Sequence, residues 1–139
     1  MTAQKVLELI QQAKDERAGK LDLSGRNLTE IPPEIAQLTS LQSLDLSYNQ
    51  ISEIPEALAQ LTSLQHLDLS YNQIREIPEA LAQLTSLQVL YLNNNQISEI
   101  PEALAHLVNL KRLFLENNPI TNVPPEIRPP AKIGTDYVQ

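Results

Sequence analysis

The feature that most constrains the fold of this chain is a 23-residue segment that recurs along most of its 139 residues. The copy that begins at Leu44 reads LDLSYNQISEIPEALAQLTSLQH, and the copy that begins at Leu67 differs from it only by Arg75 and Val89. A fixed period of this length predicts one repeated structural unit, whose copies stack and share a continuous hydrophobic core. The step is 23 residues every time, with weaker copies beginning at Leu21, Leu90 and Leu113.

Within each copy, alternating leucines are followed by a polar turn and then by a proline-containing return segment. Leu44 and Leu46 flank Asp45, and this alternation predicts a short strand with both leucines facing inward. Because an asparagine amide offers two donors and an acceptor, we expect the turn asparagines to satisfy backbone groups as a structural ladder. Proline and glutamate at the start of the return segment favour a short helix. The predicted ladder consists of Asn49, Asn72, Asn95 and Asn118, with Arg26 at the equivalent position of the first copy.

The pattern L-x-L-x-x-N-x-L at a period of 23 residues resembles the leucine-rich repeat. The resemblance implies an α/β fold, a right-handed solenoid with short parallel strands on the concave face and short helices or turns on the convex face. Aromatic residues make up only 4% of the chain, so we expect a core of aliphatic side chains. We predict a single domain over residues 1–139, with repeats starting at residues 21, 44, 67, 90 and 113.

The two ends of the predicted solenoid need structures of their own, because a terminal repeat otherwise exposes the edge of its core. Residues 2–18 predict an amphipathic capping helix, with Thr2 as N-cap and Gly19 just past its end. A helix that binds a partner or a membrane surface is the alternative interpretation. Residues 128–139 form a C-terminal tail, which either folds back over the open edge or begins a helix leading into a further domain.

The charge of the chain is strongly one-sided. The net charge is −7, and between Asn27 and Leu110 the only Lys or Arg is Arg75, against ten acidic residues. Because such a surface repels phosphate, we expect neither nucleic acid nor an anionic membrane as a partner. The acidic residues favour either a basic protein partner or simply solubility. The sequence shows no cysteine, no signal peptide and no apolar run near the ~18 residues of a membrane span, so we expect a cytoplasmic protein.

The sequence contains no arrangement that indicates catalysis, so we predict that the protein is not an enzyme. His66 and Asp68 lie two positions apart and can face the same side of a strand, as an acid–base couple would. Because Asp22 and Asp45 hold the same repeat position without a histidine beside them, the repeat itself is the simpler explanation. With no phosphate-binding glycine loop and no clustered metal ligands, we predict no cofactor, no metal site and no small-molecule substrate.

A binding surface should lie where the repeats differ, because the invariant positions build the solenoid. On the outward-facing strand positions, the aspartates of the first three repeats give way to Tyr91 and Phe114. Exposed aromatic side chains beside arginine are the usual anchors of a protein interface. Tyr71 belongs either to this surface or to the repeat consensus that it shares with Tyr48. The predicted partner-binding residues of the concave face are His66, Asp68, Tyr71, Val89, Tyr91, Asn93, Arg112, Phe114 and Glu116.

Three segments resemble the leucine-rich repeats of Roco proteins, in which the repeats precede a Ras-like GTPase domain. They are LDLSGRNLTEIPPEI from Leu21, the L-x-L-x-x-N-x-I-x-x-I-P core, and NPITNVPPEI from Asn118. The resemblance implies recognition of a protein and regulation of a GTPase, with a GTPase domain in a longer parent protein. We predict a non-catalytic signalling or regulatory scaffold that binds a protein partner on its concave face. The alternatives are a regulatory or assembly element of a Roco-type GTPase that docks through its C-terminal edge, and a consensus-type engineered repeat protein.

Overall fold

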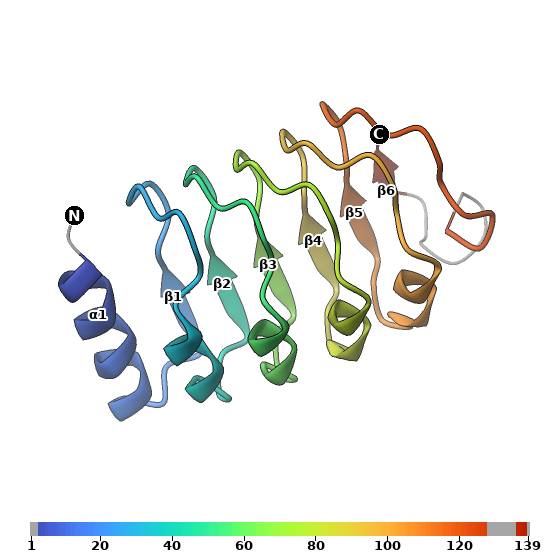
Figure 1. The fold of residues 1–139 in the computed structure, drawn as a ribbon. Coiled ribbons are helices and arrows are strands. Elements are labelled where there is room, and N and C mark those ends of the chain that lie inside the picture. The colour runs from blue at the N-terminus through green and yellow to red at the C-terminus, as the bar shows by residue number, and fades with distance from the viewer. Residues whose placement is uncertain (1–2, 128–135, 139) are drawn as a thin grey trace.

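The computed structural model describes residues 3–127 and 136–138, and a single parallel sheet runs along the whole molecule (Figure 1). The order of the strands in the sheet follows their order in the chain, and each neighbouring pair is parallel. The predicted solenoid of short parallel strands is therefore confirmed. The strands are β1 (Lys20–Asp22), β2 (Ser43–Asp45), β3 (His66–Asp68), β4 (Val89–Tyr91), β5 (Arg112–Phe114) and β6 (Asp136–Val138).

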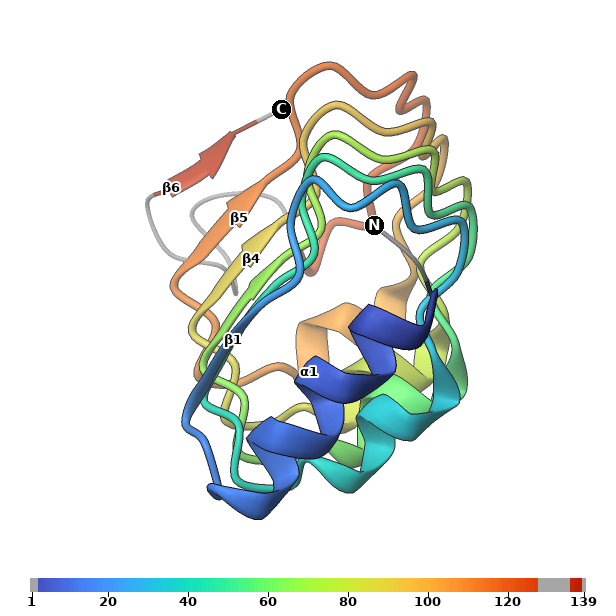
Figure 2. The same ribbon diagram turned by 90° about the vertical axis from the view of Figure 1, so that its left-hand side faces the viewer.

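Four short 3-10 helices of the described chain lie on the opposite side of the solenoid from the sheet (Figure 2). Each follows a proline in extended conformation, such as Pro55 at φ −73° and ψ 152°, which directs the chain into the turn. Because each helix is only five residues long, it adopts the tighter 3-10 form, which is used in short pieces. The helices are η1 (Pro33–Gln37), η2 (Glu56–Gln60), η3 (Glu79–Gln83) and η4 (Glu102–His106).

The core between the sheet and the 3-10 helices is built from leucine and isoleucine, as the composition predicts. It extends without interruption from Val6 in the N-terminal helix to Ile127 after the last repeat. Burying one such side chain stabilises the fold by about 1.5–3 kcal/mol, and the repeat multiplies that contribution. The innermost column pairs one leucine per strand in register, none exposing more than 1% of its surface: Leu44, Leu67, Leu90 and Leu113.

A ladder of asparagine amides holds the turns that follow the strands. Asn72 Oδ1 accepts the backbone N–H of Ile51 at 3.0 Å. Its Nδ2 donates to the carbonyls of Leu46, Leu69 and Ser70 at 3.0 to 3.1 Å, so one side chain joins two consecutive repeats. A buried amide with these partners leaves little turn backbone unsatisfied. The equivalent bonds recur at Asn49, Asn95 and Asn118.

The N-terminal helix α1 (Ala3–Asp15) covers the open end of the first repeat, in agreement with the predicted capping helix (Figure 2). Its buried residues are Val6, Ile10 and Ala13, and all three join the common core. Thr2, the predicted N-cap, lies outside the described residues. No helix among the residues that the structure describes is both long and apolar enough to cross a membrane.

The C-terminal end of α1 differs from the prediction that it runs through residues 2–18 to a stop at Gly19. Arg17 takes the left-handed conformation at φ 50°, and the N–H of Ala18 donates to the carbonyl of Ala13 at 2.9 Å. This bond closes the helix as a Schellman motif, which is usually built on glycine. The carbonyl of Gly19 instead accepts the N–H of Ser43 at 3.0 Å and so belongs to the first contact between strands.

At the other end, β6 pairs in parallel with β5 and extends the sheet by one more strand. This part of the tail is a strand and does not begin the helix that one of the two interpretations placed in the tail. The added strand covers the edge of β5, whose backbone groups would otherwise be open to pairing with another chain. The rest of the predicted tail, residues 128–135 and 139, lies outside the described residues.

Candidate binding surface

The residues that differ most between repeats lie in register along the outward side of the sheet, which we call the concave face. The last residues of β1 to β5 are partners in the register of the sheet. Because neighbouring parallel strands lie ~4.8 Å apart, their side chains form one row. The first three members are Asp22, Asp45 and Asp68, which we call the aspartate row. The last two members are Tyr91 and Phe114, which we call the aromatic pair.

Each aspartate of the row is held by the serine two positions later. Ser47 donates its backbone N–H and its hydroxyl to Asp45 Oδ1, at 2.9 and 2.6 Å. The first and third repeats show the same two bonds at the same distances. Hydrogen bonds to an ionised acceptor are among the stronger ones in proteins. These aspartates therefore stabilise the turn at the end of the strand while they also supply the charge of the surface.

The members of the aspartate row differ in acidity because their surroundings differ. Burial raises the pKa of Asp68 above its ordinary value of 3.8, the bonds from Ser70 lower it, and the charge of Asp45 raises it. At Asp22, the bonds from Ser24 lower the pKa. Negative charge is therefore less favourable at Asp68, where the row meets the aromatic pair, than at the exposed start of the row.

The aromatic pair forms a flat apolar platform next to the aspartate row. The rings of Tyr91 and Phe114 stack with centroids 4.8 Å apart and planes inclined by 5°. Their residues are partners in the register of β4 and β5, and the spacing of the strands brings the two rings to stacking distance. Both side chains are half-buried. A stacked pair contributes about 0.5–1.5 kcal/mol beyond the area it buries, so the platform is held in one geometry.

Asn93 stands beside the aromatic pair, at the position where the first three repeats carry serine. In the third repeat the serine hydroxyl donates to Asp68, whereas Tyr91 offers no carboxylate to receive such a bond. Asn93 Oδ1 is buried and has no hydrogen-bond partner within residues 3–127 and 136–138. Leaving a buried acceptor unsatisfied costs about 1–3 kcal/mol of stability.

The other predicted binding residues surround this platform on β3, β4 and β5. Val89 is half-buried and pairs in register with His66 on one side and Arg112 on the other, both of which are exposed. Glu116 is half-buried and follows Phe114 by two positions. The fold thus places an apolar centre next to a cationic guanidinium and a carboxylate.

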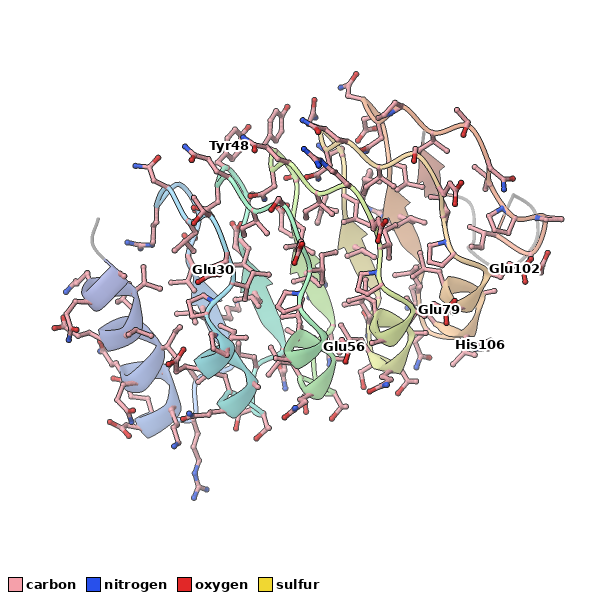
Figure 3. All side chains as sticks on the ribbon, in the orientation of Figure 1. Glu30, Tyr48, Glu56, Glu79, Glu102 and His106 are labelled. Carbon is pink, nitrogen blue, oxygen red and sulfur yellow. The ribbon has the colours of Figure 1, made fainter. Side chains whose placement is uncertain are left out.

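The structure places Tyr71 away from the strand face on which the sequence predicted it. The residue lies beyond the end of β3, in a turn, because its φ of 56° is left-handed and leaves the extended path of the strand. Its ring stacks on that of Tyr48, with centroids 4.3 Å apart and planes inclined by 7°. Tyr48, which is labelled in Figure 3, was absent from the predicted site. We call Tyr48 and Tyr71 the rim pair. Their equivalent positions in successive repeats were the one sequence signal that could have predicted the contact between the two rings.

The rim pair occupies an unusual backbone position for tyrosine. The same turn position carries Gly25, Asn94 and Asn117 in the other repeats, with φ between 60° and 62°. Glycine and asparagine tolerate this conformation, whereas other residues lose about 1–2 kcal/mol there. The side chains of Tyr48 and Tyr71 remain 60% and 43% exposed, so burial offsets only part of that cost.

The His66–Asp68 couple has a structural explanation. The two residues are the first and last of β3, and Asp68 Oδ1 accepts its two bonds from Ser70. The same arrangement occurs in the first two repeats without histidine, which fits the repeat as its origin. In the described part of the chain, no three His, Asp or Glu side chains come together in a way that could hold a metal ion.

A second acidic region lies on the flank of the solenoid away from the sheet (Figure 3). Glu56, Glu79 and Glu102 begin successive 3-10 helices there. A hollow of about 590 Å³ lies between two repeats on this flank, with Glu53, Glu76 and Arg75 in its walls. Because two glutamates per repeat at fixed positions produce this charge, we assign it to the repetition of the sequence and not to a site.

Comparison with known proteins agrees with the geometry. Residues 17–74 match a family described as Leucine rich repeat, and residues 62–106 and 85–128 match one described as Leucine Rich repeats (2 copies). A search of curated proteins gave no significant match. Among solved structures, a leucine-rich repeat protein of Leptospira interrogans is 36% identical with a TM-score of 0.76, and an internalin C2 of Listeria monocytogenes is 35% identical with a TM-score of 0.73.

These matches cover most of this chain but only part of the two solved proteins. The alignment spans 88% of this chain and 31% of the Leptospira protein, and 84% of this chain and 50% of the Listeria protein. The likeness therefore concerns the repeat domain. Neither match points to Roco proteins in particular, so that resemblance stays a prediction.

Proposed function

Because the chain belongs to the leucine-rich repeat family, we propose that it is a non-catalytic protein-binding module whose main contact surface is the aromatic pair on β4 and β5. Leucine-rich repeat domains are generally protein-interaction modules and are typically non-catalytic. Beyond this general role, we propose that the partner binds at the aromatic pair and that the protein has a regulatory or signalling role in the cytoplasm.

One observation carries the proposal: two stacked aromatic rings stand half-exposed on β4 and β5, where the row in β1 to β3 carries aspartates. Aromatic side chains hold a fixed shape, and their desolvation by a partner yields much of the energy of a protein interface. This strand position carries aspartate in the first three repeats and changes to Tyr91 and Phe114 in the last two. The change places apolar surface where the rest of the row carries charge.

The surroundings of the aromatic pair support a partner with both polar and apolar groups. Arg112 adds a cation at the edge of the platform, and arginine is enriched at the centres of protein interfaces. Val89 extends the apolar surface by one position. The amide of Asn93 adds a polar group beside the rings.

The experiment replaces the fourth repeat's surface by that of its neighbours. In the variant Tyr91→Asp/Asn93→Ser, the aspartate and serine reproduce the pair of bonds seen at Asp68 and Ser70, so the fold is preserved. The immobilised parent and variant are exposed to lysate of the source organism, and each captured protein is then purified and titrated. We expect its affinity for the variant to be at least about tenfold lower, the loss typical of an anchor residue.

A matched control changes an exposed apolar residue outside the platform. Val108→Thr puts threonine at a repeat position where Thr62 and Thr85 already stand. If parent, Tyr91→Asp/Asn93→Ser and control capture the same proteins with equal affinity, the aromatic pair is not the contact surface.

A second candidate function follows from the resemblance to Roco proteins and from the end of the sheet. As a regulatory or assembly element, the chain would dock through its C-terminal edge onto a GTPase domain or onto another copy. The strand β6 ends the order of strands, and an outer strand edge offers backbone groups for pairing. Light scattering over a hundredfold range of concentration tests the self-assembly arm, because a constant monomeric mass would remove it.

A further inference from the structure

The rim pair combines exposure with a fixed geometry in a way that its role in the repeat does not require. Three of the five equivalent turn positions carry Gly25, Asn94 or Asn117 and keep the same left-handed backbone. Tyrosine is therefore unnecessary for the turn. Local strain of this kind is found where the residue serves a function that another residue would not.

The rim pair also lies next to the aspartate row. Tyr48 directly follows Ser47, which binds Asp45 Oδ1, and the N–H of Tyr48 donates to the carbonyl of Ser70 at 3.1 Å. Loss of solvent around the stacked ring raises the pKa of Tyr48, the neighbouring Tyr71 raises it further, and the Asp68 carboxylate adds to the rise.

The stretch that holds the rim pair, Asp45 and Asp68 has no Lys or Arg of its own, and it lies between Arg26 and Arg75 in the sequence. Residues 27–74 contain neither Lys nor Arg, although they contain Asp45 and Asp68. Aromatic ring faces attract cations through their electron density, and adjacent carboxylates add a full negative charge. The combination is complementary to a planar guanidinium, which stacks on a ring and donates to a carboxylate at the same time.

We propose that the rim pair and the adjacent Asp45 and Asp68 bind an arginine side chain of a partner protein. The proposal rests on the proposed function only in taking the partner to be a protein; the site itself is separate from the aromatic pair. This site would orient the bound protein along the sheet: its basic segment lies over β2 and β3, and its apolar anchor lies over β4 and β5.

The test uses a defined probe in place of the unidentified partner. The peptide acetyl-Gly-Arg-Gly-Arg-Gly-amide is titrated into the labelled full chain and followed by NMR, alongside the analogue in which citrulline replaces each arginine. We expect saturable shifts at the backbone amides of Tyr48, Tyr71 and Asp45. Citrulline keeps the shape of arginine without its charge, so its peptide should bind at least about fivefold more weakly.

Variants separate the ring contribution from general attraction to acids. Tyr48→Asn/Tyr71→Asn keeps a residue type that this turn already accepts and should weaken the arginine peptide about fivefold. Asp45→Asn/Asp68→Asn should weaken it as well. The control Glu79→Gln/Glu102→Gln removes the same number of charges from the opposite flank and should leave the shifts at Tyr48 and Tyr71 unchanged.

Three results would overturn the proposal: equal affinity for the citrulline peptide, unchanged binding by Tyr48→Asn/Tyr71→Asn, or an equal loss in the flank control. The outcome is independent of the capture experiment with Tyr91→Asp/Asn93→Ser. Failure of that experiment with success here would remove the aromatic pair as the contact surface and keep the arginine site, and the reverse result would do the opposite.

Discussion

The two halves of the concave face share one backbone and differ in surface chemistry. In β1 to β3 the central row consists of aspartates bonded to serines, and in β4 and β5 it consists of stacked rings. The asparagine ladder continues through both halves, with bonds of 2.9 to 3.0 Å from each amide to the preceding repeat. The residues that build this fold are therefore distinct from those that determine what it contacts, so a surface can change without changing the scaffold.

The halves also differ in how well they satisfy their own polar groups. Each aspartate of the first half accepts two bonds from within its own repeat. In the second half, Asn93 Oδ1 is buried without a partner among the described residues, and the rings remain half-exposed. The first half therefore presents carboxylates that are bonded within the protein, and the second presents half-exposed rings.

The largest predicted effect tests whether the scaffold is the same in both halves. Asn72→Ala and Asn95→Ala each remove a buried amide that accepts one backbone N–H and donates to several carbonyls. We expect each variant to lower the free energy of unfolding by about 3 kcal/mol or more, because buried backbone groups lose their partners. Urea unfolding measures the loss. A difference of more than ~1 kcal/mol between the two variants would show that the halves do not share one scaffold.

The next effect tests whether the surface of the second half can be exchanged. Tyr91→Asp/Asn93→Ser loses a stacked pair worth about 0.5–1.5 kcal/mol and gains the aspartate–serine bonds of the other repeats. We expect the free energy of unfolding to fall by no more than about 1–2 kcal/mol, with circular dichroism unchanged. As the companion measurement, Phe114→Ala also loses the stack but gains no such bonds, so it should be less stable than the exchange variant. The reverse order would mean that the surface and scaffold are coupled.

A smaller effect concerns the rim pair of the first half. Tyr48→Asn/Tyr71→Asn removes two residues from a left-handed backbone that costs them about 1–2 kcal/mol each, and also removes their stacking contact. These changes oppose each other, so we expect stability within about 1 kcal/mol of the parent, on the side of greater stability. Thermal unfolding compares the two proteins. A large loss of stability would show that the tyrosines support the turn and that their exposure has no separate role.

The smallest effect is the pH dependence of the aspartate row. The raised pKa of Asp68 means that the folded state binds its proton more tightly than the unfolded state, whose pKa is near 3.8. Its contribution to stability is therefore fully present below pH 3.8 and is lost as pH rises through the folded-state pKa. Asp68→Asn should be more stable than the parent at pH 7 by a few tenths of a kcal/mol, and the difference should vanish at pH 3.

Asp22→Asn provides a control of opposite sign. The bonds from Ser24 lower the pKa of Asp22, so its ionised form stabilises the fold above pH 3.8, and that contribution is lost as pH falls through the folded-state pKa. Asp22→Asn should therefore be less stable than the parent at pH 7, again with a smaller difference at low pH. Urea unfolding at both pH values checks the pair of variants. Equal behaviour of the two would mean that burial does not distinguish the ends of the row.

The repeat made most of the fold predictable. Leucines at a period of two within the strand and of 23 between strands determine the inward face, the register and the stacking. The helix end at Arg17 was missed because the sequence offers Gly19 two positions later, whereas the hydrogen bond from Ala18 to Ala13 closes the helix first. The backbone hydrogen bonds of this one turn outweighed the preference for glycine at the end of a helix.

The candidate site was only partly predictable. The change from aspartate to Tyr91 and Phe114 is visible when the repeats are aligned, and the register of β4 and β5 places the two rings together. Tyr71 was assigned to the strand face because tyrosine itself gives no signal for a left-handed φ; the signal lay in Gly25, Asn94 and Asn117 at the equivalent positions. Its stack with Tyr48 depends on that backbone turn, which determines where both rings point.

The central claim is that departures from the repeat determine what the protein binds, while the repeat determines the fold. Isothermal titration of one captured partner against the parent and Tyr91→Asp/Asn93→Ser tests it most directly, with the thermal midpoint of both proteins measured in the same buffer. We expect the affinity to fall at least about tenfold while the midpoint changes by no more than a few degrees. Equal affinities, or a loss of affinity that appears only with unfolding, would contradict the account.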